Sequence, residues 1–197
     1  MFCISLSLIF TVPQAYRVVT RNTVEGISVT SQMQGFSGSV LWIAYGLSAQ
    51  TYLVVAANVM TLVGVGVVLV KFVEHRLVKL GMLVSIIGGV TVGSILVLQA
   101  SPIILGLVAV VVGSTGIIPQ AVRAGRTSHL VGVSVATFVI VVVMSSSWFV
   151  YGIMINDPFV AAPNVVIVPC ATFIAVRAIR SHHLYSKTME ADAVPAR

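Results

Sequence analysis

The sequence predicts an all-α membrane protein with seven transmembrane helices, arranged as two three-helix bundles joined by a single linker helix. Three observations support this fold class. The chain of 197 residues is 58% hydrophobic and only 8% charged, whereas soluble domains carry about 25% charged residues. The gaps between charged residues accommodate seven crossings, and much of the first part of the chain recurs 106 residues later. This composition excludes a cytosolic enzyme.

Charge-free stretches give the number of helices. They cover residues 1–16, 26–70 and 80–122, and residues 127–176 carry Asp157 as their one charged side chain. One crossing needs about 20 residues, so the first stretch predicts one helix and each of the others predicts two. The apolar N-terminus lacks the basic segment of a signal peptide, so it is expected to form the first span. The expected spans are roughly 2–20, 27–47, 51–70, 79–98, 103–123, 133–154 and 158–179.

Every lysine and arginine falls on one side of this topology. These cations are Arg17, Arg21, Lys71, Arg76, Lys79, Arg123, Arg126, Arg177, Arg180, Lys187 and Arg197. The positive-inside rule therefore predicts an external N-terminus and a cytoplasmic C-terminus. We expect a multi-pass protein of the cell membrane (plasma or inner).

An internal repeat relates the two halves at a fixed offset of 106 residues. PQAYR at Pro13–Arg17 returns as PQAVR at Pro119–Arg123, and LWIAYG at Leu41–Gly46 returns as SWFVYG at Ser147–Gly152. GISV also returns as GVSV, and AANV as APNV. Proline, tryptophan, tyrosine and asparagine seldom coincide by chance, so each half is expected to form one bundle of three helices.

Because three is an odd number, a fourth crossing must precede the second bundle if both bundles are to begin on the same side. The span at 79–98 is therefore expected to be a linker, with Gly89 and Gly93 forming a packing seam rather than a dimer motif. The predicted organisation is a first repeat at 1–70, a loop and linker helix at 71–101, a second repeat at 102–179 and a cytoplasmic tail at 180–197.

Two tryptophans and two asparagines are predicted to lie at one depth. Trp42 and Asn58 are 16 residues apart and centred on a turn, and Trp148 and Asn164 repeat this spacing. Each lies about 12 Å below the outer surface, close to the middle of a hydrocarbon core about 30 Å thick. An indole stacks on the C–H face of a pyranose, and an amide bonds sugar hydroxyls. We favour a substrate site; the alternative is helix packing by tryptophan and backbone bonding by asparagine.

Two serines belong to the same candidate site. Ser39 and Ser145 each precede a tryptophan by three residues and therefore share its helix face. Serines also bond the preceding turn of membrane helices, so a binding role and a structural role both stay open.

Two prolines are predicted to bend the first helix of each repeat. Pro13 and Pro119 lie near the middle of the membrane, and proline removes a backbone hydrogen bond and clashes with the preceding turn. We expect hinges rather than static bends, with Gln14 and Gln120 bonding the carbonyls that the kinks free. Asp157 is expected to form an Asx-type turn.

These motifs resemble the PQ-loop superfamily, and the W-x-x-Y-G and asparagine elements are similar to its SWEET and SemiSWEET (MtN3/saliva) sugar-transporter branch. The resemblance covers nearly the whole chain apart from the tail. It implies parallel repeats, tryptophan and asparagine in the substrate pocket, substrate selection three residues before each tryptophan, and hinges at the prolines. It also allows a gate role for Asp157. Spans 27–47 and 133–154 lack the proline of plant and animal SWEETs, so the chain looks like two fused bacterial SemiSWEET units.

The expected function is facilitative (uniport) transport of mono- or disaccharides by alternating access. Asp, Glu, Lys, Arg and His occur only at the ends of the predicted spans, which disfavours a proton relay. We expect no catalytic residue, metal, cofactor or nucleic acid; the partners are a sugar, the lipid bilayer and, as an open possibility, further copies of the chain. The alternatives are a proton-coupled PQ-loop transporter of amino acids or other small solutes, a seven-helix receptor, and a structural or interaction protein.

Overall fold

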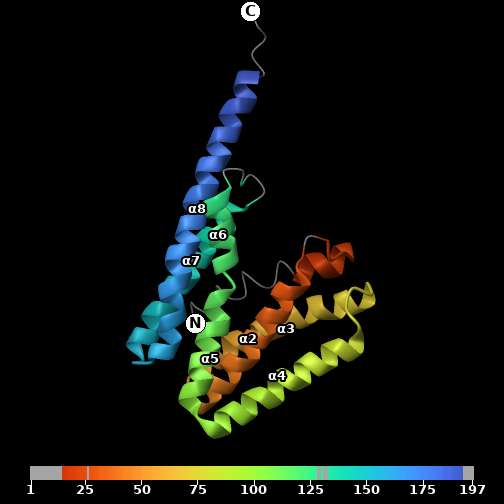
Figure 1. Ribbon diagram of the computed structural model, residues 1–197, viewed down its shortest axis with the longest axis vertical. Coiled ribbons are helices and arrows are strands. Elements are labelled where there is room, and N and C mark those ends of the chain that lie inside the picture. Colours follow the sequence, from red (N-terminus) through yellow and green to blue (C-terminus); the bar gives the residue numbers. More distant parts are fainter. Residues whose placement is uncertain (1–14, 26, 128–129, 131–132, 193–197) are drawn as a thin grey trace, which may run out of the picture. The chain divides into compact units, whose positions relative to one another are not determined.

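The computed structural model describes residues 15–25, 27–127, 130 and 133–192, and all regular structure in these ranges is helical. Residues 15–21 are helical, and the labelled elements follow them (Figure 1). They are α2 (Val29–Ser48), α3 (Tyr52–Glu74), α4 (Leu80–Ala100), α5 (Pro102–Thr115), α6 (Ile118–Arg126), α7 (Val135–Met154) and α8 (Pro158–Asp192). Most of the predicted first span, with Pro13 and Gln14, lies outside the described residues.

Five of the described segments are long and apolar enough to cross a membrane. They are α3, α4, the α5–α6 segment Pro102–Arg126, α7, and Pro158–Tyr185 of α8. The helix α2 occupies the predicted second span and carries no charge, but Gln32, Gln34 and several serines lower its hydropathy. A helix of this kind is stable in a membrane when its polar side chains bond within the protein.

The chain divides into two compact units, Met1–Gly113 and Ser114–Arg197. The division falls inside α5, whereas the repeat predicts a boundary between residues 101 and 102. The reason lies in contacts of α5 with α2: the side-chain amide of Gln34 donates to the carbonyl of Val112 at 3.2 Å. A Cβ on Gly38 would lie 3.8 Å from the Val112 side chain. Most of α5 therefore packs with the first unit.

Residues at equivalent positions of the repeat, 106 positions apart, form the cores of the two units. In the first unit Val18, Val68 and Phe72 are buried together. In the second unit their counterparts Ala124, Ile174 and Ala178 form the core in which α6 packs on α8. The internal repeat in the sequence is thus also a repeat of packing.

The linker helix α4 packs on α2, but its glycines do not take part. A Cβ built on Gly81, Gly88, Gly89 or Gly93 would meet nothing within 4 Å. Among the described residues, the expected seam at Gly89 and Gly93 is therefore not formed, and this face of α4 is open.

The segment that carries Pro119 is broken. The helix α5 ends at Thr115 and α6 begins at Ile118, so Pro119 occupies the first turn of a new helix. Proline is tolerated there because the first N–H groups of a helix have no intrahelical partner. The break lies where the sequence predicts a kink.

Candidate functional site

The turns that join α2 to α3 and α7 to α8 have the same construction. Gln50 and Asn156 adopt left-handed conformations with φ of 55° and 53°. The next residue in each chain segment donates its backbone N–H to a glycine carbonyl, Thr51 to Gly46 at 2.8 Å and Asp157 to Gly152 at 2.9 Å. Each turn determines the residue at which the following helix begins.

Asp157 caps the helix that follows it. Its Oδ1 accepts the backbone N–H groups of Phe159 and Val160 at 3.0 and 3.2 Å. This is the expected Asx-type arrangement, and it uses the carboxylate to satisfy two of the unpaired donors at the start of α8.

The two asparagines make the same local hydrogen bond. Asn58 Nδ2 donates to the carbonyl of Val54, and Asn164 Nδ2 donates to that of Val160, both at 2.9 Å. Asn164 is 6% exposed, and Asn58 is half-buried. This is the hydrogen bond to the backbone that we expect if the asparagines have only a structural role. It uses only one of the three or four bonds that an amide can make, so one N–H and the Oδ1 lone pairs still have bonding capacity for a ligand hydroxyl.

The two tryptophans are held by a tyrosine one turn further along the same helix. Trp42 and Tyr45 meet edge to face with ring centroids 5.7 Å apart and an interplanar angle of 87°. Trp148 and Tyr151 repeat this at 5.7 Å and 82°. An edge-to-face tyrosine restrains the orientation of the indole.

Gly113 is a contact of the candidate site that the sequence did not reveal. A Cβ at this position would lie 3.1 Å from Nε1 of Trp42, which is tighter than ordinary van der Waals contact. Glycine therefore allows α5 to approach the indole of Trp42. A lone glycine in an apolar helix gives no sequence signal, and its counterpart in the repeat, Ser7, lies outside the described residues.

Both serines of the candidate site are buried. Ser39 and Ser145 are each 3% exposed. The predicted residues fall into two groups, here called the candidate half-sites: Ser39, Trp42 and Asn58 on α2 and α3, and Ser145, Trp148 and Asn164 on α7 and α8. Each half-site lies within a single hairpin of packed helices.

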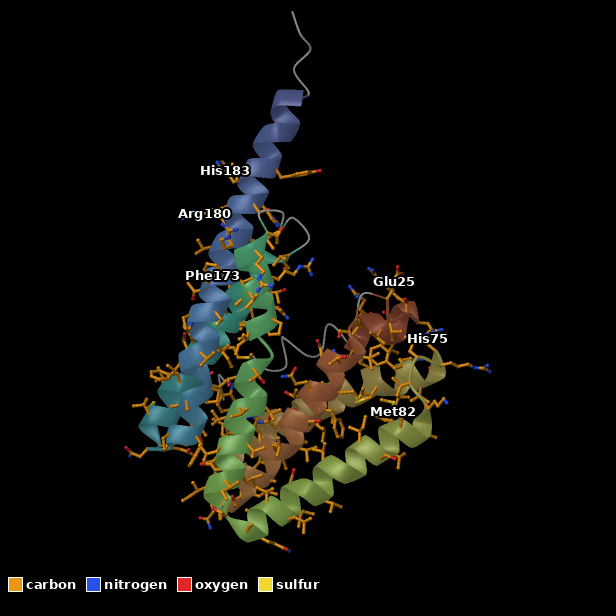
Figure 2. All side chains as sticks on the ribbon, in the orientation of Figure 1. Glu25, His75, Met82, Phe173, Arg180 and His183 are labelled. Carbon is orange, nitrogen blue, oxygen red and sulfur yellow. The ribbon has the colours of Figure 1, made fainter. Side chains whose placement is uncertain are left out.

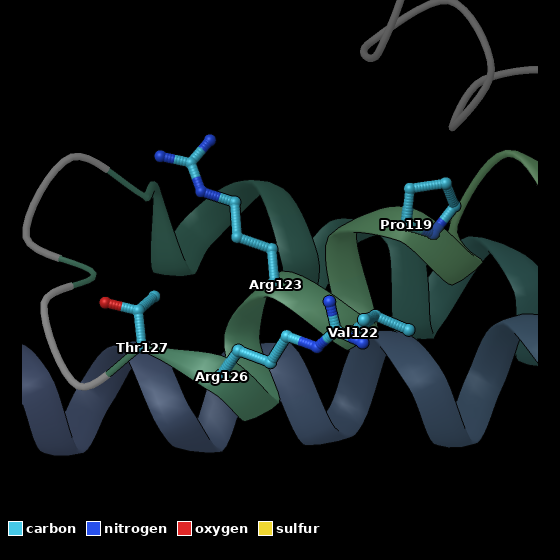
Figure 3. Close-up of a pocket in the computed structure, with 5 residues that line it drawn as sticks. All are labelled: Pro119, Val122, Arg123, Arg126 and Thr127. Carbon is cyan, nitrogen blue, oxygen red and sulfur yellow. The ribbon is translucent and has the colours of Figure 1, made fainter.

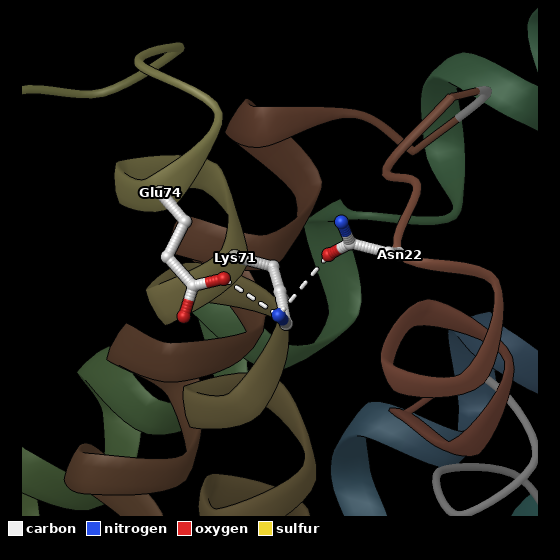
Figure 4. Close-up of polar contacts among 3 residues, drawn as sticks. All are labelled: Asn22, Lys71 and Glu74. Carbon is white, nitrogen blue, oxygen red and sulfur yellow. Dashed lines mark hydrogen bonds and ion pairs between the residues drawn. The ribbon is translucent and has the colours of Figure 1, made fainter.

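At the other end of each unit a cation bonds two neighbouring groups. These two cations are again 106 residues apart in the sequence. Lys71 Nζ donates to Asn22 Oδ1 at 3.2 Å and pairs with Glu74 at 2.6 Å (Figure 4). Arg177 donates to the carbonyls of Ala124 and Thr127, both at 3.0 Å. In the sequence, each of these cations by itself indicates only the topology. Their shared register in the repeat is the signal that identifies them as a pair.

The chemistry of the half-sites is that of neutral side chains. Within the described ranges, no group of three or more His, Cys, Asp or Glu side chains is placed to hold a metal ion. What the half-sites provide is an aromatic face and a neutral amide, which suits an uncharged polar ligand.

Comparisons with known proteins agree with this chemistry. Residues 103–177 match the family model described as a sugar efflux transporter for intercellular exchange, and residues 1–54 match the PQ loop repeat. The sugar transporter SemiSWEET of Escherichia coli (strain UMEA 3162-1) is 40% identical over 65 residues, which cover 32% of this chain and 72% of that protein.

A solved structure of a eukaryotic SWEET transporter has the same fold. The superposition has a TM-score of 0.74 at 16% sequence identity and covers 92% of this chain and 97% of that one. The protein is therefore an all-α, multi-pass membrane protein with the predicted fold of seven transmembrane segments, in which α5 and α6 together form one segment.

Proposed function

Since the chain belongs to the SWEET/PQ-loop family, we propose that it is a facilitative carrier of mono- or disaccharides that works by alternating access. The observation that carries this proposal is the matched pair of half-sites. An indole restrained by a tyrosine, and an asparagine with spare bonding capacity, occur at equivalent positions in both units. One copy of such a pair could serve packing alone, but two copies in register suit a ligand with hydroxyls on both sides.

The proposed mechanism assigns a role to each group. The tryptophan faces stack on the C–H faces of a sugar ring, and the asparagine amides bond its hydroxyls. Rocking of the two bundles opens the site to either side in turn. Pro119, which follows the break between α5 and α6, and Pro13, its counterpart in the sequence repeat, are proposed as the hinges. Among the described residues, the exposed side chain of Gln120 has no hydrogen-bond partner, and the amide that bonds a carbonyl near the break is that of Gln34.

The proposal makes this chain a transporter and not an enzyme, which is supported by the names of its relatives. A seven-helix receptor or an interaction protein gives no reason for two equivalent indole and amide pairs. A proton-coupled carrier of amino acids would share the fold. It differs from the proposed uniporter in that a proton gradient drives its transport.

Uptake into proteoliposomes tests this function. We expect a radiolabelled sugar from a panel of mono- and disaccharides to reach the external concentration inside the vesicles and stop there, with or without an imposed pH gradient. The reason is that proton relays in membranes use titratable groups at depth, and the sequence places no Asp, Glu, Lys, Arg or His in the interior of its predicted spans. Accumulation above the external concentration that an uncoupler abolishes would favour the proton-coupled alternative, and a panel without any uptake would reject sugar transport.

The proposed orientation puts the N-terminus outside the cell membrane and the C-terminus in the cytoplasm, on the asymmetry of the cations. Ser48 and Asn156 are exposed at the two hairpin turns. A cysteine at either position is expected to react with an impermeant maleimide added to intact cells, whereas a cysteine at Lys187 reacts only after lysis. Labelling of position 187 in intact cells would invert the topology.

A homo-oligomer is part of the proposal. The open glycine face of α4 supports it, because small residues let membrane helices approach each other closely.

A further inference from the structure

The short helix α6 has two contrasting faces. Ala121 and Ala124 pack in the core of the second unit. Pro119, Val122, Arg123, Arg126 and Thr127 line an open pocket of about 460 Å³ on the other side (Figure 3). Arg123 and Arg126 are exposed and three residues apart, which makes them neighbours on one helix face.

The ordinary explanation of arginines in the last turn of a helix is that they bond its terminal carbonyls. Here that task belongs to another residue. Arg177 on α8 donates Nε to the carbonyl of Ala124 and Nη2 to that of Thr127. The guanidinium groups of Arg123 and Arg126 are therefore not needed to cap α6.

Neither arginine is neutralised within the described part of the chain. The one ion pair found there joins Lys71 to Glu74 in the first unit. Two cations thus share a pocket with two apolar side chains, and Val122 is 44% exposed beside them.

We propose that this pocket binds a phosphate group. Arginine presents a planar fork of N–H donors that matches phosphate oxygens bidentately, and two forks on one face suit a single multi-oxygen anion. Pro119 and Val122 provide an apolar wall for the group that carries the phosphate. The phosphate has two candidate sources, the head group of an anionic phospholipid at the end of this membrane span and a soluble organic phosphate.

Native mass spectrometry of the purified full-length chain tests the site. The probes are phosphatidylglycerol, phosphatidylcholine with the same acyl chains, and glycerol 3-phosphate. For Arg123→Gln/Arg126→Gln we expect the affinity for phosphatidylglycerol to fall about 25-fold, because each arginine near a membrane surface contributes about fivefold to the binding of an anionic lipid. Arg123→Lys/Arg126→Lys keeps the charge but not the fork, and is expected to bind with intermediate affinity.

The matched control removes two cations elsewhere. Lys79 precedes α4, and Arg180 projects from α8 (Figure 2); both are exposed. Lys79→Gln/Arg180→Gln is expected to weaken phosphatidylglycerol binding much less than Arg123→Gln/Arg126→Gln, because neither residue lines the pocket. An equal loss of phosphatidylglycerol affinity in this control would mean that only the net charge of the protein matters, and it would overturn the proposal.

The probes also separate the two sources. Binding of phosphatidylglycerol that glycerol 3-phosphate does not displace supports a lipid site, and displacement at similar concentrations supports a soluble phosphate. Binding of phosphatidylcholine and phosphatidylglycerol with equal affinity, or no binding of either phosphate anion to the wild-type chain, would overturn the proposal. The outcome of this binding experiment does not depend on whether the chain takes up sugar, because sugar uptake tests the half-sites and not this pocket.

Discussion

Gly152→Ala is expected to destabilise the fold by about 2 kcal/mol or more. A Cβ at this position would lie 2.6 Å from the backbone nitrogen of Ala161 and 3.0 Å from its Cα and Cβ. Backbone atoms of α8 can move away only if the two helices separate. Overpacking costs about 1–3 kcal/mol, and occasionally more, and the better helix propensity of alanine offsets only up to about 1 kcal/mol.

The repeat provides a matched control in Gly46→Ala. A Cβ on Gly46 would lie 2.9 Å from Cγ2 of Val55, a side-chain methyl, and 3.4 Å from the nearest backbone atom, the carbonyl oxygen of Thr51. A small adjustment of Val55 relieves this contact, so we expect a much smaller loss of stability at the equivalent position of the first unit.

Thermal unfolding and monodispersity in detergent measure both variants. The expected order of stability is wild type, then Gly46→Ala, then Gly152→Ala, with the folding equilibrium of the last shifted by about 30-fold. Equal stability of the two variants would mean that α7 and α8 adjust as easily as a valine side chain, contrary to the packing described.

Hairpins and the repeat could be predicted from the sequence because their signals are local and strong. Charge-free stretches set the spans, and matched tryptophans, glycines and asparagines set the register. The turns at Gln50 and Asn156 lie where the sequence places them. Such features depend on residues close together in the chain, and the repeat provides each of them twice.

Long-range contacts could not be predicted in this way. The approach of Gly113 to Trp42 and the bond of Gln34 to Val112 join α2 to α5, and the repeat gives no information about contacts between helices of different repeats. For this reason the compact units divide after Gly113 and not between residues 101 and 102. Likewise, the position of Arg177 at the end of a span predicts on which side of the membrane that end lies. Which two carbonyls its guanidinium bonds depends on how α6 packs on α8.

The largest effect on sugar binding is expected from the asparagines. We expect Asn58→Ala and Asn164→Ala each to weaken sugar binding about five- to tenfold or more. A hydrogen bond to an uncharged group contributes about 1 kcal/mol, and an unsatisfied partner in a desolvated site raises the cost. The two effects need not be equal, because Asn164 is buried and Asn58 is half-buried, and because Pro163 precedes Asn164 where Ala57 precedes Asn58.

The competing explanation is that each amide serves only its own helix through the bond to Val54 or Val160. A control for this role exists on α8, where Thr172 Oγ1 donates to the carbonyl of Val168 four residues earlier at 2.8 Å. Thr172→Val removes a bond of the same kind two turns beyond the asparagine. If the amides only stabilise their helices, Asn164→Ala and Thr172→Val lower the melting temperature and leave the sugar affinity of the folded fraction unchanged. If Asn164 binds sugar, affinity falls in Asn164→Ala alone. Isothermal titration of monodisperse protein, with the melting temperature measured on the same samples, separates these outcomes, and unchanged affinity in both asparagine variants would remove the two amides from the site.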